Sequence, residues 1–79
     1  MSYRLNYSPE CEKARSQLTR SQRRDLDSGM ARVCQNPYGC GSSQTYQKDR
    51  RVVTCGSVFA EYFVSTDVVL ITVVRVHAV

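Results

Sequence analysis

Val68-Val69-Leu70-Ile71-Thr72-Val73-Val74-Arg75-Val76-His77-Ala78-Val79 is the stretch that decides the fold of this 79-residue chain. Eight of its twelve residues are Val, Leu or Ile, whose side chains favour extended backbone because they pack well on a pleated surface. Residues 68–74 show no alternation of apolar with polar side chains, so both faces of this strand need to be covered or shielded. The stretch therefore predicts a central strand, with Arg75 and His77 near its end.

Length and composition are those of one small domain, residues 1–79, with a thin hydrophobic core. Apolar residues make up 42% and charged residues 23% of the chain, which argues against disorder. The apolar run at the end is shorter than the roughly 20 residues of a transmembrane helix. Residues 1–10 lack the apolar centre of a secretory signal. We therefore expect a cytoplasmic protein that does not associate with membranes.

The net charge of +4 comes from 11 basic and 7 acidic residues, and arginine carries nearly all of it, since lysine occurs only at positions 13 and 48. A small basic protein suits an anionic partner such as nucleic acid or an acidic protein segment. The same charge also suits simple solubility, and one helical cluster, Arg20, Arg23 and Arg24, is open to both interpretations. Charge alone does not choose between them.

The four cysteines, Cys11, Cys34, Cys40 and Cys55, form no C-x-x-C pair, and one histidine does not complete a zinc pattern. We therefore expect no metal and no cofactor. Reduced, buried thiols are the expected state in a cytosolic protein. Cys34 and Cys40 are the local candidates for a disulfide.

The first half of the chain predicts a short strand followed by two helices. Alternation over residues 3–7 indicates the strand. Ser8-Pro9-Glu10 is typical of a helix start, and this helix extends to about residue 18. Thr19 and Gln22 have the spacing of a capping box, and the second helix ends at Asn36, because the residue before Pro37 avoids helical backbone.

The second half predicts three strands. Residues 37–49 form a long connection without phosphate-loop spacing, strands cover 50–55 and 58–64, and turns lie at Gly56-Ser57 and at residues 65–67 before the final strand. The central strand needs two neighbours, so we expect sheet order 1-4-3-2 with the first strand parallel to the last. The fold class is α+β, β-α-α-β-β-β, with a two-helix hairpin packed on one face of a four-stranded, mostly antiparallel sheet. Function is expected on the open face.

This order of elements resembles the RelE/ParE superfamily of bacterial toxins, and local similarities accompany it along the chain. They are the opening strand and helix start at residues 3–10, Asn36-Pro37-Tyr38-Gly39, Asp49-Arg50-Arg51-Val52-Val53, Glu61-Tyr62-Phe63-Val64 with Asp67, and Val74-Arg75-Val76-His77. The sequence departs from RelE-like nucleases at Gly56-Ser57-Val58-Phe59, where those proteins usually have Gly-x-Tyr-Arg. The resemblance implies the toxin of a toxin–antitoxin pair, bound by a cognate antitoxin protein.

The superfamily contains two activities, and both stay open for this chain. RelE-like members cleave mRNA in the ribosome, which makes a metal-independent endoribonuclease (mRNA interferase) that inhibits translation the favoured interpretation. ParE-like members inhibit DNA gyrase without a catalytic step. A third possibility is an inert relative that only binds its antitoxin. Oligomeric state is not indicated by the sequence.

RNA cleavage without a metal needs a base for the 2′-hydroxyl, cations for the phosphate and an acid for the leaving oxygen. Histidine is the residue type best suited to proton transfer near neutral pH, and we assign His77 with Lys48, Arg50 and Arg51 to the catalytic set. Arg50 and Arg51 are consecutive, so at most one of them faces a given site. The expected RNA-binding residues are Arg75, Tyr46 and Tyr62, because arginine pairs with phosphate and tyrosine stacks on bases.

Overall fold

The computed structural model describes residues 2–43 and 49–78, and contains the two helices and four strands expected from the sequence. In chain order they are β1 (Arg4–Tyr7), α1 (Pro9–Ser16), α2 (Arg20–Gln35), β2 (Arg50–Cys55), β3 (Val58–Ser65) and β4 (Leu70–Ala78). The sheet has the order β1-β4-β3-β2. β1 runs parallel to β4, while β3 is antiparallel to both β4 and β2. The predicted fold class and topology are confirmed.

Two element boundaries differ from the prediction by two residues. α1 ends at Ser16 and not at about residue 18. Residues 66–69 form the turn between β3 and β4, so the final strand begins at Leu70 and not at Val68. Val69 takes a positive φ of 53° in this turn, and Val68 is exposed. The apolar composition of the stretch suggested strand at both positions, but the hairpin needs residues to reverse direction and takes them from the start of the run.

Both helices begin at side-chain caps that the sequence indicated. The Ser8 hydroxyl accepts a hydrogen bond from the backbone N–H of Cys11 at the start of α1. Thr19 and Gln22 exchange two bonds at the start of α2, each side chain accepting from the other residue's N–H. These bonds satisfy donors that the first helical turn leaves without partners, so each helix has a fixed start relative to the strand or link before it.

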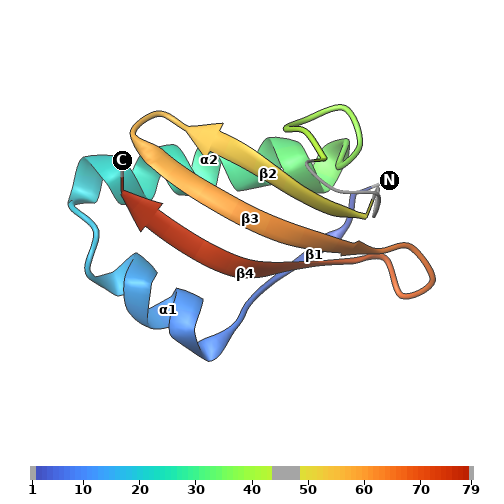
Figure 1. The fold of residues 1–79 in the computed structure, drawn as a ribbon, viewed down its shortest axis with the longest axis horizontal. Coiled ribbons are helices and arrows are strands. Elements are labelled where there is room, and N and C mark those ends of the chain that lie inside the picture. The colour runs from blue at the N-terminus through green and yellow to red at the C-terminus, as the bar shows by residue number, and fades with distance from the viewer. Residues whose placement is uncertain (1, 44–48, 79) are drawn as a thin grey trace.

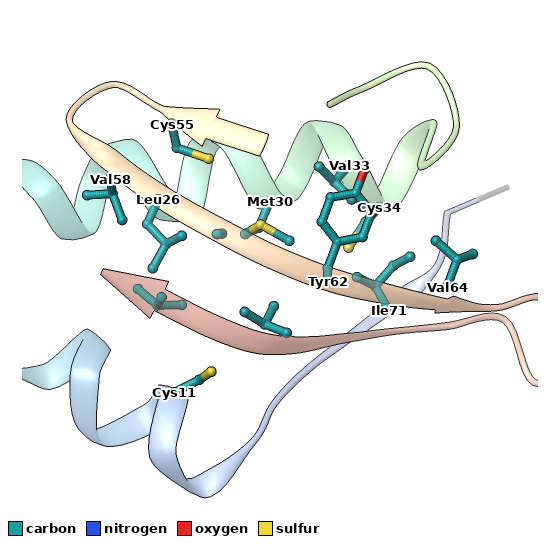
Figure 2. Close-up of a cluster of buried hydrophobic side chains, with 13 residues drawn as sticks. Cys11, Leu26, Met30, Val33, Cys34, Cys55, Val58, Tyr62, Val64 and Ile71 are labelled. Carbon is teal, nitrogen blue, oxygen red and sulfur yellow. The ribbon is translucent and has the colours of Figure 1, made fainter. Parts of the chain in front are cut away.

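The core lies between the helices and one face of the sheet. α2 packs behind β2 and β3, and α1 lies beside β4 (Figure 1). Figure 2 shows the apolar side chains that fill this layer. The sheet contributes every second residue of β3 and part of β4, namely Val58, Ala60, Tyr62, Val64, Ile71, Val73 and Val76. α2 contributes Leu26, Met30, Val33 and Cys34. The opposite face of the sheet has no covering helix in the described part of the chain.

The four cysteines are free thiols in this structure. Cys11, Cys34 and Cys55 are buried, and Cys40 is half-buried. Burial raises the pKa of Cys34 and of Cys55, because an apolar environment disfavours the thiolate. Three of the four cysteines therefore belong to the core and act there as small apolar side chains.

Gly29 allows α2 to approach β2 closely. A Cβ atom added at this position would lie 2.2 Å from Sγ and 2.9 Å from Cβ of Cys55. We therefore expect Gly29→Ala to lower the free energy of unfolding by about 1–3 kcal/mol, because overpacking outweighs the better helix propensity of alanine. Urea denaturation of both proteins measures the change. Cys55→Ala in the Gly29→Ala background should restore part of the loss, and equal losses with and without Cys55→Ala would contradict the contact.

Candidate functional site: the open face of the sheet

A β-bulge in β4 decides which residues face the open side. Ile71 and Val73 point into the core, so simple alternation would also direct residues 75 and 77 inward. The register shifts instead between Glu61 and Tyr62: Tyr62 pairs with Val73 and Glu61 pairs with Arg75. Val74 is therefore the extra residue, and a bulge of this kind reverses the alternation beyond it.

Beyond the bulge, Val76 is buried while Arg75 and His77 are exposed. Both side chains thus lie on the open face. Bulges commonly redirect side chains in this way next to functional sites.

Charged side chains of three adjacent strands meet on the open face. Arg50 of β2 forms an ion pair with Glu61 of β3, and Glu61 lies directly opposite Arg75 of β4. The Glu61 side chain is only 14% exposed, whereas Arg50 is 47% exposed. The arrangement is a carboxylate that binds the Arg50 guanidinium and has Arg75 at the paired position of the next strand.

Aromatic side chains lie beside this charged group. His77 pairs with Phe59 across β3 and β4, and their rings stack with centroids 4.9 Å apart. Phe63 lies two positions beyond Glu61 and is 40% exposed. Such a combination of exposed aromatic rings and arginine on an open sheet can stack bases and bind the phosphate between them.

His77 also borders a pocket of about 290 Å³ between α1, the link to α2 and the end of β4. Its walls include Ala14 and Leu18 as well as Val76. His77 therefore lies where this recess meets the open face, on which its ring stacks with Phe59.

The predicted site residues divide into three groups. Arg50, Arg75 and His77 share the open face, and Arg51 and Tyr62 lie on the helix-covered face, where they pair with each other across β2 and β3. Lys48 and Tyr46 lie outside the described residues. The structure therefore brings together three of the seven predicted residues.

Assigning Tyr62 to RNA binding was wrong, because its side chain is fully buried in the core. Its hydroxyl lies 2.9 Å from the carbonyl oxygens of both Pro37 and Cys40, to which it donates. Figure 2 shows the ring beside Val33 and Cys34. Tyr62 thus anchors the segment after α2, and its ring is not available to a base.

Arg51 belongs to the same anchor and not to the open face, so its assignment to the catalytic set is also corrected. Its guanidinium donates to the carbonyl oxygens of Tyr38, Cys40 and Gly41 at 3.1–3.3 Å. It also lies 5.9 Å from the centre of the Tyr38 ring. These carbonyl contacts use the donors on Nε and Nη2, and together with its place on the helix-covered face they give Arg51 a structural role.

Tyr38 completes this anchor by joining it to the start of β2. Its hydroxyl donates to the carboxylate of Asp49 at 2.5 Å. That hydrogen bond, reinforced by burial, raises the pKa of Tyr38 to about 12, since the bond requires the phenol proton. Arg51, Tyr62 and Tyr38 together fix the segment 37–41 against β2 and β3.

Glu61 is the site residue that the sequence analysis missed. The signal was present in β3, where buried Ala60, Tyr62 and Val64 alternate with the residues between them. The same alternation places Phe59, Glu61 and Phe63 together on the other face. Among residues 2–43 and 49–78, no group of three His, Cys, Asp or Glu side chains is arranged to hold a metal ion. No helix in the described part of the chain is long and apolar enough to cross a membrane.

Comparison of the sequence with family models gives no match, and comparison with curated proteins gives none either. Comparison with solved structures gives close matches over nearly the whole chain. A mutant of the Escherichia coli toxin RelE in the free state superimposes with a TM-score of 0.86 at 20% identity, covering 99% of this chain and 84% of that one. The chain has the RelE fold.

Two complexes extend this RelE fold comparison to distant organisms. The toxin–antitoxin complex RelBE2 of Mycobacterium tuberculosis matches with a TM-score of 0.88 at 10% identity and covers 100% of both chains. The archaeal RelE–RelB complex of Pyrococcus horikoshii matches with a TM-score of 0.70 at 15% identity, over 99% of this chain and 96% of that one. At these identities the similarity establishes the fold, and the chemistry has to be argued from this chain's own residues.

Proposed function

We propose that this protein is the toxin of a toxin–antitoxin pair and that it cleaves mRNA in the ribosome. The observation that carries the proposal is the shared open face of Arg50, Glu61, Arg75 and His77, in a fold common to RelE toxins. This face offers a carboxylate, two guanidinium groups and an imidazole. Those are the groups that RNA cleavage without a metal requires.

In the proposed reaction the Glu61 carboxylate takes the proton of a ribose 2′-hydroxyl, and the freed 2′-oxygen attacks the adjacent phosphorus. Arg50 and Arg75 stabilise the negative charge that builds up on the phosphate oxygens. The His77 imidazolium gives its proton to the departing 5′-oxygen. The products are a 2′,3′-cyclic phosphate and a 5′-hydroxyl, so one proton is taken up and one is released.

The sheet register suits this division of roles. Glu61 and His77 lie at diagonal positions on neighbouring strands, because His77 pairs with Phe59 and Arg75 pairs with Glu61. Diagonal side chains are separated by about 7–8 Å. A base and an acid at that separation can reach the attacking and leaving oxygens on opposite sides of one phosphorus atom, with Arg75 on the strand next to Glu61.

An antitoxin partner is part of the proposal, and the sheet provides an edge for it. β1 pairs with β4 only from Leu70 to Val73. No described strand pairs with Val74–Ala78 on that side. An unpaired edge can accept an added strand from another protein, and a strand bound here would lie next to His77.

Expression in growing bacteria tests the function. We expect incorporation of labelled methionine to fall within minutes of induction, plasmid supercoiling to stay unchanged, and co-expression of the neighbouring reading frame to restore growth. Relaxed plasmids together with continuing translation would contradict the proposal and indicate that the protein inhibits gyrase. Unchanged growth would indicate an inert relative of the toxins that only binds its antitoxin.

A further inference from the structure

The outer face of α2, opposite the open face of the sheet, carries a row of arginines that the proposed reaction does not use. Arg20, Arg24 and Arg32 lie on it with Ser28 between the last two, each position four residues after the one before. All four side chains are exposed. Residues at this spacing follow one ridge of a helix, about 6 Å apart along the axis. We call this row the α2 ridge.

The two acidic residues of α2, Asp25 and Asp27, flank the ridge, and each carboxylate is directed to a group outside it. Asp27 binds Arg15 of α1 through two hydrogen bonds, at 2.6 and 3.0 Å. The Asp25 carboxylate lies against Gly56 in the β2–β3 turn. No ion pair joins an arginine of the ridge to a carboxylate anywhere in residues 2–43 and 49–78. The three arginines of the ridge therefore keep their charge unpaired within the described residues.

Arg23, although close in sequence, does not belong to this surface. Its guanidinium donates to the backbone carbonyl of Leu18 at 3.2 Å and approaches that of Ser16 at 3.5 Å. It thus holds the end of α1 and the link between the helices. Arg23 therefore has a structural role, whereas the three arginines of the ridge face solvent.

The position of Arg20 disfavours the helix that carries it. The first turn of α2 contains no acidic residue, and Arg20 stands at its first position. A cation there is repelled by the positive end of the helix dipole. An unfavourable local choice of residue points to a role outside folding.

We propose that the α2 ridge binds the phosphate backbone of an RNA duplex. Arginine is suited to phosphate because its planar guanidinium makes two parallel hydrogen bonds. Arg20 and Arg24 are about 6 Å apart along the helix axis and Arg24 and Arg32 about 12 Å, so the row can contact phosphates spread along one strand. The proposal rests on the proposed function, in which the open face holds mRNA and the ridge holds structured RNA of the ribosome.

The composition of the face around the ridge favours nucleic acid over protein. Its other exposed residues are Ser21, Ala31, Gln35 and Asp27, whose carboxylate binds Arg15, so it contains no large apolar side chain. Protein interfaces usually have an apolar or aromatic centre. Interfaces with nucleic acid are more polar and strongly positive, which is what this face offers.

Binding of a 16-base-pair RNA duplex, measured from 50 to 300 mM salt, tests the ridge. With Arg20, Arg24 and Arg32 all changed to Gln, we expect at least about 30-fold weaker binding at 100 mM salt and a salt slope smaller by about 2–3. Arg24→Gln alone should weaken binding about fivefold. Lys13→Gln, which removes one exposed charge from α1, should change it less than twofold.

Thermal unfolding provides a second readout that a purely structural role would not give. Arg20→Gln should raise the melting temperature by about 1–5 °C while weakening duplex binding, because it relieves the unfavourable dipole interaction. Unchanged duplex binding by the triple variant would overturn the proposal. Equal effects of Arg24→Gln and Lys13→Gln on duplex binding would also overturn it. So would tighter binding of the wild-type protein to a DNA duplex than to the RNA duplex. A triple variant that no longer binds polyglutamate but keeps its RNA affinity would assign the ridge to an acidic protein instead.

These outcomes are separable from a failure of the proposed function. Duplex binding is measured without ribosomes and requires no cleavage. Thr54→Ala, a change on the open face outside the proposed reaction, should bind the duplex like the wild-type protein, whether or not the wild type cleaves mRNA. If the ridge binds RNA but the protein does not cleave mRNA, the proposal for the ridge stands and only the proposed reaction is contradicted.

Discussion

Tyr62→Ala is expected to lower the free energy of unfolding by about 3–5 kcal/mol, the range for removal of a large buried aromatic ring. Tyr62 is fully buried, and its hydroxyl anchors Pro37 and Cys40. Truncation therefore removes core volume and the anchor of segment 37–41 together. In a domain this small, such a loss is a large part of the total stability. Urea denaturation followed by circular dichroism measures it.

Tyr62→Phe separates the two contributions and serves as the matched control. It keeps the ring and removes the hydroxyl, so we expect a loss of about 1–3 kcal/mol, chiefly because the Pro37 carbonyl loses this donor while Cys40 keeps the one from Arg51. The folded Tyr62→Phe protein should bind RNA as tightly as the wild type. A stable Tyr62→Phe protein with weakened RNA binding would contradict the burial of this residue and restore it to the binding surface.

His77→Ala is expected to lower the rate of mRNA cleavage in a single turnover by about 10²–10⁴-fold, the usual contribution of a general acid. His77 is exposed on the open face, so its removal should cost little stability beyond the stacking contact with Phe59. The measurement uses purified protein, ribosomes carrying a defined mRNA, and primer extension to quantify the cut ends.

Glu61→Gln should cause a loss of similar size, because the amide cannot take the proton of the 2′-hydroxyl. The double variant of Glu61 and His77 should be much less impaired than the product of the single effects, since the two groups act in one step. Thr54→Ala is the control on the same face: Thr54 is exposed and lies opposite Phe59 in β2, and its loss should change the rate less than twofold. A full rate in His77→Ala would remove the imidazole from the mechanism.

The fold was largely predictable because its signals are local and agree with one another. The capping groups Ser8 and Thr19, the Pro37 that ends α2 and the apolar β4 each indicate one element. The need for two neighbours then places β4 in the centre of the sheet. The start of β4 was missed by two residues, since the turn before it uses valines, which the composition alone assigns to strand.

The site was less predictable because it depends on pairing between strands. Alternation from Ile71 directs residues 75 and 77 into the core, and only the bulge at Val74 brings Arg75 and His77 to the open face. Residue type was misleading for Arg51 and Tyr62, whose polar groups bind backbone carbonyls after α2. Glu61 was missed since a single carboxylate in an apolar strand has no motif of its own.

The most direct test of the proposed function is the chemistry of the cut ends. Wild-type protein is incubated with ribosomes carrying a 5′-labelled mRNA, and with the same mRNA free in solution. We predict a fragment ending in a 2′,3′-cyclic phosphate when ribosomes are present, and its near absence with His77→Ala and with Glu61→Gln. Intact mRNA in every reaction, or fragments that end in a 3′-hydroxyl, would contradict cleavage by the groups on the open face.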